Sequence, residues 1–132
     1  MRPVVLSLVL LATGHAALAQ TPLTAEQFDA FTRGRTLMYH FHGQAYGAER
    51  YEADRKVTWS FLDGDCRKGR WYPQGHLICF AYEDRETPQC WTFYAEGGSL
   101  RAMFESPDNG LELYEAGETD EDLLCLGPKI GV

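Results

Sequence analysis

Short segments with strand-like alternation, separated by turn sequences, fill the chain from Thr36 onward. They recur at the roughly 8–12-residue spacing that is typical of all-β domains. Turns such as Asp63-Gly64 and Asp108-Asn109-Gly110 are short and therefore join antiparallel neighbours. The sequence predicts a mainly β fold, an antiparallel up-and-down meander that forms a small closed or strongly curled barrel. The expected strands cover residues 36–42, 47–52, 56–62, 66–72, 76–82, 90–96, 99–105 and 111–115.

A short helix is expected over residues 25–32, ahead of the first strand. Thr24 is its predicted N-cap, and Gln27, three residues later, completes a capping box. Phe28 and Phe31 fall on one face of this helix. We expect the two rings to pin the helix to the body of the domain.

The first 19 residues have the pattern of a secretory signal peptide. Arg2 precedes an apolar run that reaches Ala12, and Ala17-Leu18-Ala19 matches an A-x-A cleavage site. The run is well short of the ~20 apolar residues that span a bilayer, so no stable membrane insertion is expected. The sequence therefore predicts a signal peptide over residues 1–19 and one domain over residues 20–132, exported to the periplasm or the extracellular space.

The net charge bears on the class of partner. The whole chain has a formal net charge of −7. Removing residues 1–19 takes away Arg2 and no acid, which gives about −8, and an acidic domain lacks the electrostatic footprint of a nucleic-acid binder. We therefore expect no nucleic acid among the partners.

All four cysteines lie in the predicted exported part, and an even number in a small secreted chain indicates disulfides. Their gaps of 13, 11 and 35 residues lack the close pairs of a zinc site. Cys79 and Cys90 fall on neighbouring predicted strands, which favours a bridge between them and leaves Cys66 to pair with Cys125. Three pairings remain possible, and Cys66 with Cys79 would also join neighbouring strands.

Aromatic residues alternate along the predicted strands, as Trp59 and Phe61 do on one face of theirs. Rings of this kind are expected to fill the barrel, because each removes roughly 150–250 Å² from water when buried. A ligand pocket lined by rings is the alternative interpretation. Its candidate residues are Tyr39, Trp59, Phe61, Trp71, Phe80, Trp91 and Phe93.

Two histidines one residue apart, His40 and His42, would face the same side of a strand and suit a shared metal ion. The neighbouring Tyr39 and Phe41 form the more apolar side, so the histidines are expected to face solvent. His76 is the third candidate ligand, if closure of the barrel brings it near. We therefore interpret these histidines mainly as solvent-exposed strand residues. A metal site that they form together is the secondary hypothesis.

No arrangement of residues typical of catalysis is apparent. The serines of the predicted strands lack the G-x-S-x-G nucleophile motif. Glu49, Glu52 and Glu83 are interpreted as ordinary strand carboxylates on the surface, since nothing marks two of them as a facing pair. Glycine-rich nucleotide motifs are also lacking, so neither enzymatic activity nor a cofactor is expected.

Four patterns together resemble small exported bacterial proteins grouped as domains of unknown function, over about residues 34–104. The resemblance implies a compact, disulfide-bonded β domain of the cell envelope and supplies no catalytic residues. The chain is also distantly similar to lipocalin-like barrels and periplasmic inhibitors. The patterns are Tyr46-Gly47-x-Glu49-x-Tyr51, Cys66-x-x-Gly69-x-Trp71, Ile78-Cys79-Phe80-x-Tyr82 and Cys90-Trp91.

The sequence as a whole predicts a non-enzymatic, exported cell-envelope domain that binds a protein partner or a small apolar ligand. A metal-binding periplasmic protein that uses His40 and His42 is the first alternative, and a hydrolase is the second.

Overall fold

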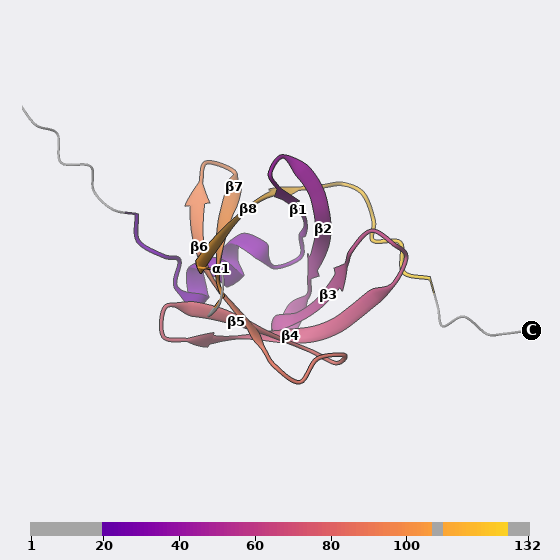
Figure 1. Ribbon diagram of the computed structural model, residues 1–132, viewed down its shortest axis with the longest axis horizontal. Helices are drawn as coiled ribbons and strands as arrows, with labels where there is room; N and C mark the ends of the chain where they lie inside the picture. Colours follow the sequence, from indigo (N-terminus) through magenta and orange to yellow (C-terminus); the bar gives the residue numbers. More distant parts are fainter. Residues whose placement is uncertain (1–19, 107–109, 127–132) are drawn as a thin grey trace, which may run out of the picture.

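Eight antiparallel strands close into a barrel in a computed structural model that describes residues 20–106 and 110–126 (Figure 1). The predicted signal peptide lies outside the described residues. The meander expected from the sequence is confirmed, and of its two predicted forms the closed barrel is the one observed. The strands are β1 (Thr36–Phe41), β2 (Gln44–Tyr51), β3 (Lys56–Ser60), β4 (Cys66–Gln74), β5 (Leu77–Tyr82), β6 (Gln89–Glu96), β7 (Ser99–Ser106) and β8 (Gly110–Glu118).

The barrel closes where β8 pairs with β1, with Leu37 opposite Glu118 and His40 opposite Glu115. Every strand therefore has a paired neighbour on each side. Alternation along each strand sends one set of side chains inward. The inward set forms a core rich in rings, and its largest buried members include Tyr51, Leu37, Val57 and Ile78.

Helix α1 (Ala25–Thr32) begins and ends where the sequence predicts. Its capping box is formed, because the Gln27 amide nitrogen donates to Thr24 Oγ1 at 3.2 Å and the Thr24 nitrogen donates to Gln27 Oε1 at 3.0 Å. After the helix, the amide of Gly34 donates to the carbonyl of Tyr51 at 2.8 Å and ties the connection to the end of β2. Among the described residues, no helix is long and apolar enough to cross a membrane.

Phe28 anchors α1 across one end of the barrel, and in Figure 1 the helix lies across the space that the strands enclose. Its ring is fully buried. It packs 5.6 Å from the ring of Tyr51, 5.1 Å from Trp71 and 4.5 Å from Phe93, centroid to centroid. The helix thus closes the barrel at the end where β2 finishes.

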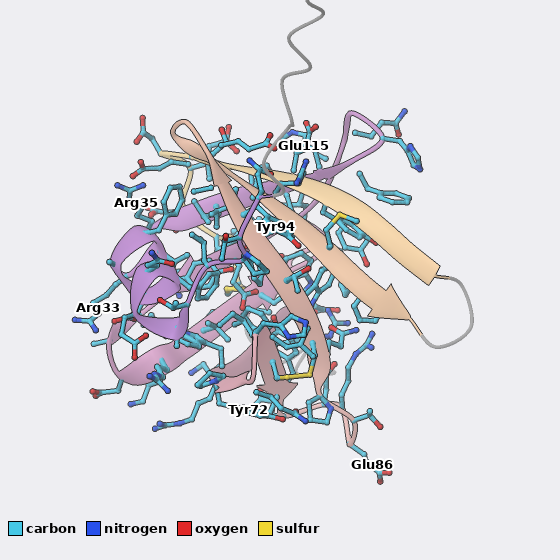
Figure 2. The ribbon with its side chains drawn as sticks, turned by 90° about the vertical axis from the view of Figure 1, so that its left-hand side faces the viewer. Arg33, Arg35, Tyr72, Glu86, Tyr94 and Glu115 are labelled. Atoms are coloured by element: carbon cyan, nitrogen blue, oxygen red, sulfur yellow. A yellow bond between two sulfur atoms is a disulfide. The ribbon has the colours of Figure 1, made fainter. Side chains whose placement is uncertain are left out.

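Two disulfides staple the outside of the barrel, and they use the pairing that the sequence favours. Cys79 on β5 is bonded to Cys90 on β6, and Cys66 at the start of β4 is bonded to Cys125. Figure 2 draws a disulfide close to the labelled Tyr72, which is the register partner of Cys79. Two disulfides in so small a domain indicate an oxidising, exported environment.

The segment after β8 crosses the outer face of β1, β2 and β3 to reach Cys66 (Figure 1). The Leu126 amide donates to the carbonyl of Gly64 at 2.7 Å. A narrow crevice runs between this segment and the barrel wall, where Ala48 and Ser60 are buried although their side chains point outward. Residues 119–124 of this segment therefore cover one flank of the barrel on its outside.

Candidate ligand-binding cavity

The barrel interior holds a cavity of about 130 Å³ that is partly open to solvent. Its more exposed lining residues include Tyr46, which is 39% exposed, and Arg85. Tyr46 lies near the start of β2, whereas α1 packs on Tyr51 at the end of that strand. The mouth is therefore at the end opposite the helix, and the rings around Phe28 form the floor.

Most of the predicted pocket rings meet at this cavity. Trp71 does not line it: the side chain is 2% exposed, lies edge-on to Phe28 at the helix end and has the Arg55 guanidinium 4.6 Å from its ring centroid. Trp71 is thus a core residue, and its assignment to the pocket is corrected. The predicted residues that line the cavity are Tyr39, Trp59, Phe61, Phe80, Trp91 and Phe93.

Several lining residues were not singled out from the sequence as pocket residues. They share inward positions on strands or places at the rim, and several of them are polar. They are Tyr46, Glu49, Tyr51, Arg67, Tyr82, Arg85, Gln89, Phe104 and Tyr114.

Glu49 is the most unusual of these residues, because its carboxyl is inside the barrel and 1% exposed. Its Oε1 accepts a 2.9 Å hydrogen bond from the Tyr82 hydroxyl, whereas its Oε2 is buried with no partner among the described residues. Burial raises the pKa of Glu49 well above its ordinary value, and the bond from Tyr82 only partly opposes this. The carboxyl therefore favours the neutral, proton-bearing form.

The expectation that Glu49 is an ordinary surface carboxylate is wrong. In the pattern Tyr46-Gly47-x-Glu49-x-Tyr51, Glu49 is two residues from the fully buried Tyr51 and two from Gly47, so all three share the inward face. This alternation is the signal in the sequence that indicates an inward Glu49. The general tendency of carboxylates to face water predicts the opposite orientation.

Two tyrosine hydroxyls form a second buried polar pair next to Glu49. The hydroxyl oxygens of Tyr39 and Tyr51 are 2.6 Å apart and share a hydrogen bond. Burial raises the pKa of both phenols above the ordinary value, and the neighbouring Glu49 adds to the effect. Both phenols are therefore neutral and partner each other, which leaves Glu49 Oε2 as the unsatisfied atom in this part of the cavity.

Glycines make room for the two rings nearest Glu49. A Cβ at Gly69 would lie 2.8 Å from Cδ1 of Tyr82, and a Cβ at Gly47 would overlap the Trp59 indole. Each ring lies directly against the backbone of a neighbouring strand. The glycines thus allow large rings to line the wall.

Two arginines stand on the mouth side of the cavity. Arg67 donates from Nε to Asp84 Oδ2 at 2.6 Å, and its guanidinium lies 4.8 Å from the Phe61 ring centroid. Its Nη1 is buried and has no hydrogen-bond partner among the described residues. Arg85 is close enough that its charge opposes the upward shift that burial and Glu49 impose on the pKa of Tyr82.

The three predicted metal-ligating histidines are not brought together. Strand β1 ends at Phe41, so His42 lies in the following turn with a positive φ of 48°, and the prediction that it shares a strand face with His40 is wrong. His76 lies in the β4–β5 turn. In an up-and-down barrel this turn is at the opposite end of the barrel from the β1–β2 turn, which contains His42. Across residues 20–106 and 110–126, no three His, Cys, Asp or Glu side chains cluster as a metal site.

Comparisons with protein-family models, curated proteins and solved structures found no match to this chain. The cavity is therefore the feature that supports a functional proposal.

Proposed function

We propose that the protein is a non-enzymatic domain of the cell envelope, periplasmic or extracellular, that binds a small and largely apolar organic molecule inside its barrel. The observation that carries this proposal is the unpartnered Glu49 Oε2 in a cavity with aromatic walls. Buried polar atoms in proteins are almost always hydrogen-bonded, so an exception on a residue that lines a cavity favours a ligand.

The energetics of the empty cavity support the same proposal. A buried polar group without a partner costs about 1–3 kcal/mol, and a ligand that supplies the missing hydrogen bond recovers part of this. The flat faces of Trp59 and Trp91 line the same space and add apolar contact. One polar contact within an apolar wall is typical of small-molecule sites.

The cavity volume limits the size of the ligand. At about 130 Å³ it is slightly smaller than the roughly 150 Å³ cavity that holds benzene in an engineered protein, and well below the ~300–1,000 Å³ of larger ligand sites. The buried part of the ligand is therefore about one ring, or an aliphatic group of equal size. Any larger portion has to remain in the mouth.

Binding is favoured over hydrolysis because the cavity contains a single acid. Glu49 is the one carboxyl among the described residues that line it. Glycosidase-type chemistry uses two carboxyl groups that flank the bond to be broken. Glu49 therefore has no second carboxyl group in the described lining to act with it in hydrolysis, whereas recognition of a ligand needs only this one group.

Calorimetric titration with single-ring probes tests the proposal. The probes are benzyl alcohol, benzoate and benzylamine, which share a ring and differ in charge. We expect at least one of them to bind the native chain. If none binds, the proposal is overturned.

A pair of tryptophan variants tests whether the probe enters the barrel. Phe104→Trp adds bulk at a residue that lines the cavity, whereas Tyr94→Trp adds similar bulk outside, where Tyr94 lies 5.0 Å from the Arg101 guanidinium. Figure 2 labels Tyr94, which belongs to β6. We expect the first variant to lose probe binding and the second to keep it. Equal binding by both would place the probe elsewhere.

A further inference from the structure

Two residues that line the cavity have buried polar atoms without partners: Glu49, at Oε2, and Arg67, at Nη1. They occupy matching positions on β2 and β4, because Glu49 pairs with Trp59 on β3 and Trp59 pairs with Arg67. Neighbouring strands are about 4.8 Å apart, so the two backbones are at most about 10 Å apart across β3. Within the described residues no ion pair joins the two side chains, and Trp59 holds the register position between them.

Arg67 presents a hydrogen-bond donor whose charge is permanent. Its Nε is already bonded to Asp84, so the unpartnered Nη1 is the donor that remains. The planar guanidinium matches carboxylates particularly well. Arg85 adds a second positive charge to the lining. Asp84 pairs with Arg67 and offsets part of its charge, so the free Nη1 and the second guanidinium of Arg85 are what favour an anionic group at the mouth.

Glu49 also acts as a donor in its neutral form. Its Oε1 accepts from Tyr82, which leaves the proton of a neutral carboxyl on Oε2. Burial favours this form by raising the pKa of Glu49. Both unpartnered atoms of the cavity are thus donors, and each requires an acceptor on the ligand.

We infer that the ligand is a small organic acid whose carboxylate is bound by Arg67, whose apolar body is about one ring in size, and whose far end presents an acceptor oxygen to Glu49. This inference rests on the proposed function and specifies the chemical class of the ligand. A cationic amine is disfavoured, because it would meet Arg67 and Arg85 at the mouth and would have to ionise a buried carboxyl.

The experiment compares benzoate, benzyl alcohol and benzylamine on the native chain by calorimetric titration. A hydrogen bond to a charged group contributes ~1.5–3 kcal/mol, so benzoate is expected to bind at least about tenfold more tightly than benzyl alcohol. Rising salt should weaken the binding of benzoate and leave the binding of benzyl alcohol unchanged. This salt comparison needs no variant and remains decisive if Arg67 variants fail to fold.

Arg67→Met should remove the preference for benzoate over benzyl alcohol. Arg70→Met is the matched control, since Arg70 is exposed on the same strand and does not line the cavity. It should keep the preference.

A fourth probe, 4-hydroxybenzoate, tests the Glu49 end of the cavity. A para hydroxyl supplies the acceptor oxygen that Glu49 Oε2 lacks, so this probe should bind several-fold more tightly than benzoate, with a neutral hydrogen bond contributing about 1 kcal/mol. Glu49→Leu should abolish that advantage and keep the preference for benzoate over benzyl alcohol.

The outcomes separate this inference from the proposed function. Equal binding of benzoate and benzyl alcohol, tighter binding of benzylamine, or no advantage of 4-hydroxybenzoate would overturn the inference while small-molecule binding stands. Failure of every probe would overturn both.

Discussion

The hydroxyl of Tyr82 on β5 donates a 2.9 Å hydrogen bond to Oε1 of Glu49 on β2. These strands are not neighbours in the sheet, because β3 and β4 separate them along one side. The bond therefore crosses the barrel interior and links two parts of its wall. It also fixes the orientation of the Glu49 carboxyl, so that the unpartnered oxygen is Oε2.

Removing this bond should destabilise the barrel. Tyr82→Phe leaves both Glu49 oxygens without a donor, and we expect the free energy of unfolding to fall by about 1–3 kcal/mol. Urea denaturation of the native chain and the variant measures this loss. Tyr72→Phe removes a hydroxyl from an exposed position on β4 and should change stability by at most about 0.5 kcal/mol. Equal losses in both variants would contradict the role given to the bond.

The pH dependence of stability should reveal the buried carboxyl. The pKa of Glu49 is raised in the folded state, so as pH rises above about 4.3 the unfolded chain releases this proton before the folded protein does. The contribution of Glu49 to stability is therefore full below that pH and is lost on approach to the raised pKa, by up to about 1.4 kcal/mol per pH unit.

Glu49→Gln has no proton to release and isolates this contribution. The free energy of unfolding of the Gln variant, minus that of the native chain, should rise with pH, as measured by urea denaturation from about pH 4 to about pH 8. Subtraction cancels the other titrating groups. A difference that stays flat over this range would show that Glu49 does not retain its proton in the folded state.

Phe28 should contribute much of the stability at the helix end. Phe28→Ala removes a fully buried ring that packs on Tyr51, Trp71 and Phe93, and should cost about 3–5 kcal/mol. Phe31→Ala is the control, because that ring is only partly buried and should cost clearly less. Thermal and urea unfolding measure both. A loss at Phe31 as large as at Phe28 would contradict the floor assigned to Phe28.

The two disulfides should contribute unequally to stability. Cys66 and Cys125 are 59 residues apart, and Cys79 and Cys90 are 11 apart. The chain-entropy model gives about 4 kcal/mol for the longer loop and about 3 kcal/mol for the shorter. Paired Cys→Ala variants, compared by urea unfolding, should reproduce this order. The reverse order would show that the Cys66–Cys125 bond contributes less than its loop length implies.

Local patterns predicted much of the fold. The capping box of Thr24 and Gln27 placed α1 correctly, and strand alternation with turn sequences placed all eight strands. These features depend on residues close together in the chain, which the sequence displays directly. Closure of β8 onto β1 depends on long-range pairing, so the sequence left a curled sheet as the alternative.

The positions of Trp71, His42 and Glu49 differ from the predicted ones for physical reasons. Alternation shows which way Trp71 points but not its height along the barrel, and at the helix end it packs on Phe28 instead of the cavity. The strand-like run of residues continues to His42, but β1 ends at Phe41 and the turn formed by His42 and Gly43 follows it. Glu49 departs from the expected surface position because its place in the alternation points it inward, although burying a carboxyl is usually costly.

The chain contains three tryptophans, and their indole N–H signals provide the most direct test of ligand binding inside the barrel. Trp59 and Trp91 line the cavity, whereas Trp71 packs on Phe28 away from it. Nitrogen-15 NMR during titration with benzoate should shift the Trp59 and Trp91 signals with one common dissociation constant, and shift Trp71 much less. Three unmoved signals, or a shift confined to Trp71, would contradict a ligand site in the barrel.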